Sequence, residues 1–339
     1  MSNLPKIGID LGSSSVKIVE LASIGKDKWK LLSAASMHSQ GAVVGNKSSM
    51  NAVVSDLAKL LKEAGTRGRQ AVASIPEELA YSHLVTLPIM SEAEIDQALS
   101  WQVEQYIPIP KDQVVWSYDI TKKDEVGGEI EVMLVAVPKT IAEWYRQVLE
   151  QSGLEVVALE TELAATARAI VPANIPTSVI VDIGSKGTDI GVIRNGKLVF
   201  SRVLPTAGEA FTRAIETTLG LEPAVAEQYK NSYGFANNQL EGKLLEAMKP
   251  VLNMISLEVR KTIDFHVSKH AGEIIKMVTL SGGIAALPDV VTALSTLLGV
   301  EVVIANPFSK VNLDDLQKKE LTGHEAFYAV AVGLSMKGM

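Results

Sequence analysis

The chain has 339 residues, of which 47% are hydrophobic and 21% charged, and its formal net charge is −7. This length is large for a single hydrophobic core, so we expect two lobes. The negative charge excludes the basic footprint of a nucleic-acid-binding protein, and the absence of cysteine excludes disulfides, thiolate catalysis and cysteine-based metal sites.

The N-terminal stretch 7–21, IGIDLGSSSVKIVEL, predicts a strand, a turn of small residues and a second strand. Asp10 stands at the end of the first strand, next to Gly12 and three serines. Glycine lets a ligand approach the backbone, hydroxyl and N–H groups donate to phosphate oxygens, and a carboxylate can hold Mg²⁺ through water. A hairpin whose polar residues serve only the turn is the simpler interpretation of one such stretch.

The remainder of the first half predicts an α/β lobe with an insertion. A helix over 51–64 and a strand over 70–75 continue the lobe. Residues 81–155 are typical of an inserted subdomain, with a helix over 91–107 that opens on an S-x-x-E capping box.

The second half repeats the N-terminal stretch. Residues 179–193, VIVDIGSKGTDIGVI, align with residues 7–21, so each half of the chain carries one copy. The aligned pairs are Asp10 with Asp182, Gly12 with Gly184 and Ser13 with Ser185. Two such copies indicate two similar domains that face each other, each supplying one phosphate-binding loop.

A long helical stretch over 240–270 is predicted to break near Pro250. His266 and His270 are spaced i, i+4 on it, and Glu273 follows. This spacing is compatible with a metal site, but without further ligands an exposed helix face is the preferred interpretation.

Two helices rich in small residues are predicted to pack closely. One covers 160–170, with Glu160 and Glu162 near its start, and the other covers 323–336 at the end of the chain. Each has small residues four positions apart, which lets two helices approach closely: Ala165 and Ala169 in the first, Ala329 and Gly333 in the second.

Five stretches now stand in an order that resembles the actin-like ATPase superfamily, which includes actin, sugar kinases and heat-shock chaperone ATPases. They are the stretch 7–21, the helix 160–170, the repeat 179–193, the Ser-Gly-Gly turn 281–283 and the final helix 323–336. The resemblance implies an α/β, two-lobed actin-like fold with duplicated ribonuclease H-like domains and nucleotide in the cleft between the lobes.

Within the superfamily the chain most resembles the PilM family of type IV pilus assembly proteins, in the FtsA-like branch. The most specific segment is EQYIPIP at 104–110, within the longer matching segments 87–114 and 135–162. The family resemblance implies a small α+β subdomain inserted in the first lobe. The implied units are a first lobe of 1–80, 156–174 and 319–339; an inserted FtsA-type subdomain of 81–155; a second lobe of 175–215 and 274–318; and its helical nucleotide-side subdomain of 216–273.

The resemblance also implies a binding site for ATP and Mg²⁺. Asp10 and Asp182 would hold Mg²⁺ through water, and a Glu-x-x-Lys pair, Glu227 and Lys230, resembles the ribose clamp of heat-shock ATPases. The other implied cofactor-binding residues are Gly12, Ser13, Ser14, Lys17, Gly184, Ser185, Thr188, Gly208, Gly282 and Gly283.

The resemblance does not decide whether the protein hydrolyses ATP. It needs a group that orients the attacking water, for which Glu162 is the first candidate and Glu160 the second, with Asp10 as a further catalytic candidate. Slow hydrolysis is compatible with the resemblance. The alternatives are an ATP-dependent kinase for a sugar or acid, a cell-division protein like FtsA without its membrane tether, and a cytoplasmic part of a secretion platform.

The family resemblance implies a scaffold of the type IV pilus inner-membrane platform. Its partner would be the N-terminal cytoplasmic segment of a PilN-like membrane protein, with pilus ATPases and self-association as further contacts and no nucleic acid. The chain contains no signal peptide and no run of 18 apolar residues. We therefore expect a cytoplasmic protein that reaches the inner membrane only through its partners.

Overall fold

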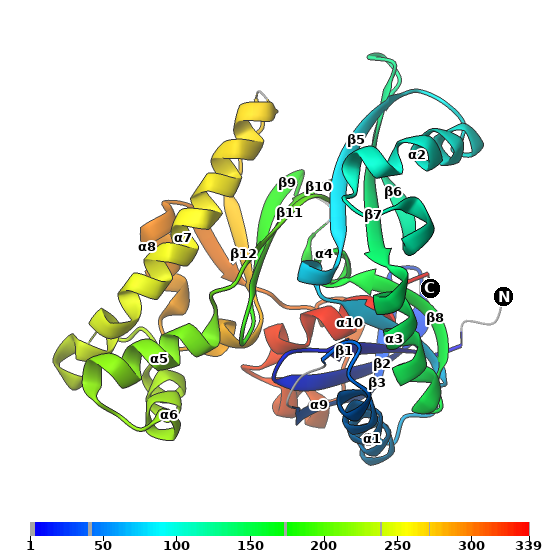
Figure 1. Cartoon of the computed structure of the whole chain (residues 1–339). Helices are drawn as coiled ribbons and strands as arrows, with labels where there is room; N and C mark the ends of the chain where they lie inside the picture. The colour runs from blue at the N-terminus through cyan, green and yellow to red at the C-terminus, as the bar shows by residue number, and fades with distance from the viewer. Residues whose placement is uncertain (1–3, 40–42, 173–174, 238, 271, 339) are drawn as a thin grey trace.

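The computed structural model describes residues 4–39, 43–172, 175–237, 239–270 and 272–338, which form two lobes and a smaller unit beside them (Figure 1). Each lobe contains one β-sheet, and the smaller unit contains a third. No helix in the described part of the chain is both long enough and apolar enough to cross a membrane.

The sheet of the first lobe has the order β14-β3-β2-β1-β4-β8. Strands β1, β2 and β3 form an antiparallel meander, and β4 and β8 continue it in parallel on the other side of β1. Helices α1 and α3 cover one face, where Leu57 and Val148 are fully buried. The elements are β1 (Lys6–Leu11), β2 (Ser15–Gly25), β3 (Lys28–His38), α1 (Lys47–Glu63), β4 (Gln70–Ile75), α3 (Lys139–Gln151), β8 (Glu155–Thr161), β14 (Val311–Asn312) and α9 (Asp315–Leu321).

The sheet of the second lobe, β11-β10-β9-β12-β13, repeats this plan. Strands β9, β10 and β11 form the antiparallel meander, and β12 and β13 are the parallel continuation. The shared order of five strands is the structural counterpart of the internal sequence repeat. The elements are β9 (Thr177–Ile183), β10 (Thr188–Arg194), β11 (Lys197–Leu204), α5 (Gly208–Leu219), α6 (Pro223–Tyr233), α7 (Lys243–Lys269), β12 (Met277–Ser281), α8 (Val290–Leu298) and β13 (Glu301–Ile304).

Helices α4 (Glu162–Ile170) and α10 (Ala329–Ser335) pack against each other between the two sheets. A Cβ atom on Gly333 would lie 1.8 Å from the carbonyl oxygen of Ala165, so only glycine allows this approach. The predicted close contact between the two helices is therefore confirmed at these two residues. The last helix is shorter than predicted, because Glu325–Tyr328 forms a 3₁₀ turn before it.

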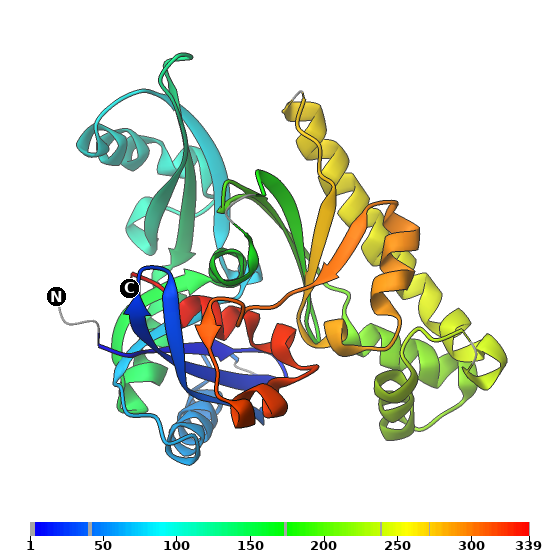
Figure 2. The ribbon, with the colours of Figure 1, turned by 180° about the vertical axis from the view of Figure 1, so that it is seen from behind.

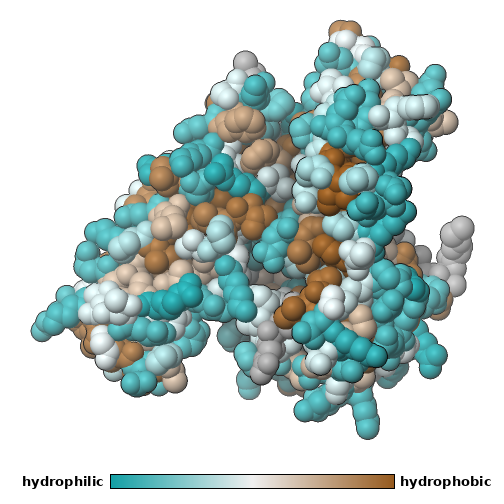
Figure 3. Space-filling model, viewed as in Figure 1, coloured by the Kyte–Doolittle hydropathy of each residue, from teal (hydrophilic) through white to brown (hydrophobic). Residues whose placement is uncertain are grey.

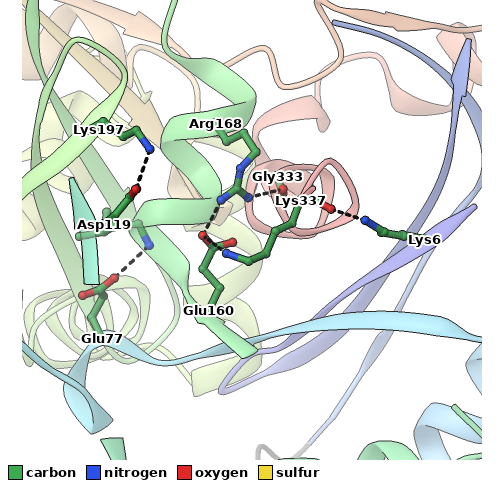
Figure 4. A network of polar contacts seen from close by, with 9 residues as sticks. Lys6, Glu77, Asp119, Glu160, Arg168, Lys197, Gly333 and Lys337 are labelled. Atoms are coloured by element: carbon green, nitrogen blue, oxygen red, sulfur yellow. Dashed lines mark hydrogen bonds and ion pairs between the residues drawn. The ribbon is translucent and has the colours of Figure 1, made fainter. Parts of the chain in front are cut away.

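Polar contacts surround this crossing (Figure 4). Arg168 of α4 donates to the carbonyl oxygen of Gly333 at 2.7 Å and pairs with Glu160. Glu160 also accepts from Lys337 at 2.9 Å. Glu160 is thus engaged in holding α4 to the end of the chain, which leaves Glu162 as the carboxylate that reaches the space between the lobes.

The smaller unit is inserted between β4 and β8 and has its own core. Its sheet has the order β5-β7-β6, and α2 packs on one face with Ile95 and Leu99 fully buried. Ser91 caps α2, accepting from the N–H of Glu94 while the Glu94 carboxylate accepts from the N–H of Ser91, as the sequence predicted. The elements are β5 (Tyr81–Pro88), α2 (Glu92–Tyr106), β6 (Val114–Asp124) and β7 (Glu129–Pro138).

The inserted sheet contacts the second lobe, where β5 and β6 lie beside β11 (Figures 1 and 2). Met133 of β7 is buried within the same hydrophobic cluster that fills the second lobe. Hydrophobic side chains gather along this junction in the space-filling view (Figure 3). The subdomain is therefore tied to the first lobe by its chain connections and to the second lobe by side chains.

Two predictions for the long helix were wrong. Helix α7 runs unbroken from Lys243 to Lys269 through Pro250, because buried side chains on both sides of the proline anchor it to the second lobe. His266 is not on an exposed face: it is 4% exposed, and its Nε2 lies 2.7 Å from Oε2 of Glu273. The residue is a buried, hydrogen-bonded histidine.

Candidate functional site

Two equivalent hairpin loops face each other across the space between the lobes. In the first, the N–H of Gly12 donates to the carbonyl oxygen of Ser15 at 3.0 Å, and in the second, the N–H of Gly184 donates to that of Gly187 at 3.0 Å. Together with the start of α4 and the turn after β12, they enclose a cavity of about 830 Å³. This volume lies within the usual range for small-molecule and cofactor sites.

The structure brings almost all the predicted site residues to this cavity. Those that line it are Asp10, Gly12, Ser13, Ser14, Lys17, Glu162, Asp182, Gly184, Ser185, Gly208, Glu227, Lys230, Gly282 and Gly283. Thr188 departs from the prediction: it is fully buried, and its hydroxyl donates to the carbonyl oxygen of Thr206 at 2.6 Å. Its position in β10 directs the side chain into the lobe and away from a ligand.

Asp10 and Lys17 lie opposite each other in the β1–β2 ladder and form an ion pair of 2.8 Å. The Lys17 ammonium also lies 4.4 Å from the centre of the Phe327 ring, in cation–π geometry. Only one oxygen of Asp10 is used in this way: Oδ1 is buried and has no hydrogen-bond partner within the described residues. A buried carboxylate oxygen without a donor fits a cation or a cation-bound water.

The second loop has a carboxylate where the first has its lysine. Asp189 lies opposite Asp182 in the β9–β10 ladder, as Lys17 lies opposite Asp10. Asp189 hydrogen-bonds to Glu162, and Asp182 accepts from the hydroxyl of Ser281. Between the two loops, the ammonium of Lys17 therefore interacts with the buried carboxylates of Asp10, Asp182 and Glu162.

Burial, and then repulsion among these carboxylates, raises their pKa values. The pKa of Glu162 lies well above its usual range because the side chain is buried and faces Asp189 and Asp10. The pKa of Asp189 is likewise well above its usual range, and burial also raises the pKa of Asp182. A cation between the two loops would lower this electrostatic cost.

We expect Asp189→Asn to stabilise the ligand-free protein at pH 8 by about 1 kcal/mol, as polar substitutions that relieve strain at sites often do. A carboxyl with a raised native pKa binds its proton more tightly in the folded state, so stability falls as pH rises from about 4 through the native pKa. The variant should therefore lose less stability between pH 5.5 and pH 8 in urea unfolding. Asp264→Asn on the exposed surface of α7 is the control; equal slopes for Asp189→Asn and wild type would contradict the prediction.

The opposite side of the cavity is built by α5 and α6. Lys230 is 4% exposed, and its ammonium donates to Glu227 at 2.6 Å, to the hydroxyl of Thr212 at 2.8 Å and to the carbonyl oxygen of Gly208 at 3.2 Å. The N–H of Gly208 in turn donates to the carbonyl oxygen of Gly184 at 3.0 Å. The Glu-x-x-Lys pair is thus linked to the second loop through Gly208.

The turn after β12 closes the cavity through its glycines. Gly282 has a φ of +82°, and a Cβ there would lie 2.4 Å from the carbonyl oxygen of Ile183. Gly283 has open space around it, so a flat ligand can lie against this backbone.

Glu77, Asp189 and Phe327 are among the lining residues that sequence reasoning missed. Asp189 was visible as the counterpart of Lys17 in the repeat, and Glu77 follows the end of a predicted strand just as Asp10 does. Glu77 is buried, and its Oε1 accepts from the N–H of Leu163 at 3.1 Å, which holds the start of α4 (Figure 4). Phe327 carried no local signal, because it reaches the cavity from the far end of the chain.

The donors fit magnesium held through water better than magnesium bound directly. No three histidine, aspartate or glutamate side chains among the described residues are arranged to coordinate a metal by themselves. Asp10 and Asp182 nevertheless face the same cavity from the two loops. Mg²⁺ commonly keeps several waters and takes its remaining ligands from phosphate oxygens, which suits two such carboxylates.

Comparison with known proteins places this geometry in context. The family model described as type IV pilus assembly protein PilM matches residues 8–339. A solved structure of a PilM-PilN type IV pilus biogenesis complex is similar with a TM-score of 0.83 and 26% identity, covering 99% of both chains. The cell division protein FtsA of Bacillus subtilis is 24% identical over 350 residues, which covers 89% of this chain and 78% of FtsA.

A more distant structure shows the same fold. MreB5 of Spiroplasma citri bound to AMPPNP has a TM-score of 0.58 at 14% identity and covers 100% of this chain and 97% of its own. The predicted two-lobed actin-like fold is confirmed by these similarities together with the duplicated sheet.

Proposed function

The chain belongs to the PilM family of type IV pilus assembly proteins, and we propose that it serves there as an ATP-binding scaffold. The single observation that carries the proposal is the pair of facing loops, with a free Asp10 oxygen on one and Asp182 on the other, across a cavity of about 830 Å³. The Mg²⁺ of a nucleoside triphosphate complex would supply the positive charge that the buried carboxylates of this cavity lack, and a cavity of this volume is large enough for the nucleotide. The AMPPNP bound to MreB5, which has the same fold, supports the same choice of ligand.

In this proposal each side of the cavity has a separate task. Asp10 and Asp182 hold Mg²⁺ through water, and Lys17 faces the phosphates from the first loop. Backbone and hydroxyl groups of both loops donate to the phosphates, while Glu227 and Lys230 face the ribose and Gly282 and Gly283 the base. The cofactor-contacting loop residues are Gly12, Ser13, Ser14, Gly184 and Ser185, and Gly208 at the start of α5 faces the adenosine.

Hydrolysis is proposed to be slow. Glu162 is the carboxylate at the start of α4 that faces the cavity, so it is the group placed to orient water. Burial and the surrounding carboxylates hold its pKa well above the usual range, which favours the protonated form. A protonated carboxyl is a poor acceptor for the proton of an attacking water.

The proposed partner is the N-terminal cytoplasmic segment of a PilN-like membrane protein. This rests on the similarity to the PilM-PilN complex over 99% of the chain. The inserted subdomain and the first lobe would form the peptide site, and the protein would reach the inner membrane through this partner. In this view the four units are the functional domains of the chain, with two corrections to the predicted boundaries. Helix α3 belongs to the first lobe, because its buried side chains lie in the core of that lobe, and β14 belongs there too, because it pairs with β3.

Calorimetric titration tests the two parts separately. ATP is titrated into the full chain with Mg²⁺ and, in parallel, with EDTA; saturable binding that is tighter with Mg²⁺ is the expected result. A synthetic N-terminal peptide of a PilN-like protein and its scrambled counterpart are titrated in the same way. Absence of ATP binding under both conditions overturns the nucleotide site, and equal binding of both peptides overturns the proposed partner.

A further inference from the structure

One hairpin of the second lobe joins the candidate site to the inserted subdomain. At one end of β10 and β11, Asp189 and Val203 line the cavity. At the other end, Arg194 and Lys197 lie opposite each other in the ladder and both contact the inserted subdomain. A single hydrogen-bonded hairpin therefore spans from the proposed nucleotide site to the interface with the subdomain.

The contact made by Arg194 is buried. Its side chain is 7% exposed and pairs with Glu131 of β7, whose side chain is 15% exposed, and a second carboxylate, Glu273, lies 3.7 Å away. The Arg194 Nε has no hydrogen-bond partner among the described residues. These two carboxylates therefore stabilise the buried guanidinium, and loss of Glu131 would leave it with only the more distant one.

Glu273, the second carboxylate near Arg194, is fixed by hydrogen bonds within the second lobe. Glu273 accepts from the hydroxyl of Thr177 at 2.9 Å and lies 2.7 Å from Nε2 of the buried His266. Glu273 is thus fixed relative to β9 and α7, whereas Glu131 belongs to the inserted sheet. Arg194 sits between a fixed carboxylate of its own lobe and a carboxylate of the subdomain.

A second ion pair on the same interface has a different character. Lys197 and Asp119 are 2.7 Å apart, but their side chains are 44% and 63% exposed (Figure 4). Exposed pairs contribute little to stability, whereas breaking a buried pair is strongly unfavourable. Arg194 is therefore a strong candidate for holding the subdomain in place, and Lys197, three residues further along the chain, is its matched control.

We propose that the buried Arg194–Glu131 pair fastens the inserted subdomain to the second lobe and thereby couples nucleotide binding in the cleft to the position of that subdomain. The subdomain follows the first lobe by its chain connections and contacts the second lobe through this pair and through the buried Met133, so movement between the lobes must strain both contacts. A ligand between Asp10 and Asp182 fixes the two lobes relative to each other. The nucleotide part of this proposal rests on the proposed function, while the fastening itself rests on the contacts alone.

The coupling has a thermodynamic consequence. Without the pair, the subdomain and second lobe sample additional arrangements, and only a fraction of molecules is ready to bind. Apparent affinity falls by that fraction, and coupling of this kind usually amounts to at least about fivefold. By reciprocity, a ligand that binds the inserted subdomain more tightly in one arrangement than in the other changes nucleotide affinity through the same pair.

The experiment uses the full chain and two readouts. Because the sequence has no cysteine, cysteines at the exposed positions Gln97 of α2 and Asp264 of α7 can carry spin labels without a background. The distance distribution between them is measured in wild type, Arg194→Met, Glu131→Gln and Lys197→Met, without ligand and with ATP and Mg²⁺. ATP–Mg²⁺ affinity is measured by calorimetry in the same four proteins, and thermal unfolding verifies that each is folded.

We expect one narrow distance distribution in wild type and Lys197→Met, and an added longer population in Arg194→Met and Glu131→Gln. The latter two should also bind ATP–Mg²⁺ at least about fivefold more weakly, and their combination should add nothing further. Unchanged distances and affinities in folded Glu131→Gln would overturn the proposal while leaving the nucleotide site intact. If wild type binds no ATP, the coupling fails with the proposed function, and the ligand-free distances still decide whether the pair fastens the subdomain.

Discussion

Asp10→Asn should weaken ATP–Mg²⁺ binding by about 10- to 100-fold, the usual effect of removing a group that orients a metal's ligands. Asp10 is 3% exposed, and its Oδ1 is the buried oxygen that has no donor within the described structure. Asparagine preserves the shape of the side chain but removes the negative charge that a metal-bound water would meet. The substitution should therefore reduce the gain in ATP affinity that Mg²⁺ provides, and leave the affinity without Mg²⁺ largely unchanged.

Calorimetric titrations of ATP with Mg²⁺ and with EDTA separate that part from the rest. In wild type the two affinities should differ strongly, and in Asp10→Asn they should converge. Asp27→Asn is the matched control, because Asp27 lies in the turn between β2 and β3, outside the residues that line the cavity. An Asp10→Asn protein that keeps the full Mg²⁺ dependence would remove Asp10 from the site.

Asp189 and Glu162 show what the internal repeat could and could not predict. Alignment of the two copies placed both loops correctly, because a strand–turn–strand pattern is determined by neighbouring residues. It did not reveal that Asp189 would meet Glu162, since these residues come from different segments and are joined only by the packing of α4 against β10. Local pattern predicted the loops, and tertiary packing produced their electrostatics.

His266 and Pro250 illustrate the opposite case, in which local rules were correct on average and wrong here. Proline usually interrupts a helix, and histidine is intermediate in burial, so a histidine without other recognisable ligands was assigned to an exposed helix face. Helix α7 overrides both rules because one side of it is buried along its length in the second lobe. The sequence placed Glu273 near His266, but the burial of this pair depends on the packing of α7 against the second lobe, which the local pattern did not show.

The close approach of α4 and α10 was predicted from small residues four positions apart, and it gives the sharpest expectation for stability. Gly333→Ala should lower the free energy of unfolding by at least about 3 kcal/mol, the upper end of what overpacking usually costs. The added Cβ would lie 1.8 Å from the carbonyl oxygen and 2.4 Å from the carbonyl carbon of Ala165. Backbone atoms cannot turn aside as a flexible side chain can, so the two helices must move apart.

The separation of the helices should also change the site, because Glu162 begins α4 and Glu77 accepts from the N–H of Leu163 in the first turn of that helix. Urea unfolding measures the loss, and Gly283→Ala is its control, since a Cβ at Gly283 meets nothing within 4 Å. Gly283→Ala should unfold like wild type yet bind ATP more weakly, because its methyl group would occupy the surface proposed for the base. Gly333→Ala should instead lose stability first, with weaker ATP binding as a consequence of displaced helices. Equal stability of Gly333→Ala and wild type would mean that the helices do not touch at Gly333 and Ala165, and the lobes would then be joined in some other way.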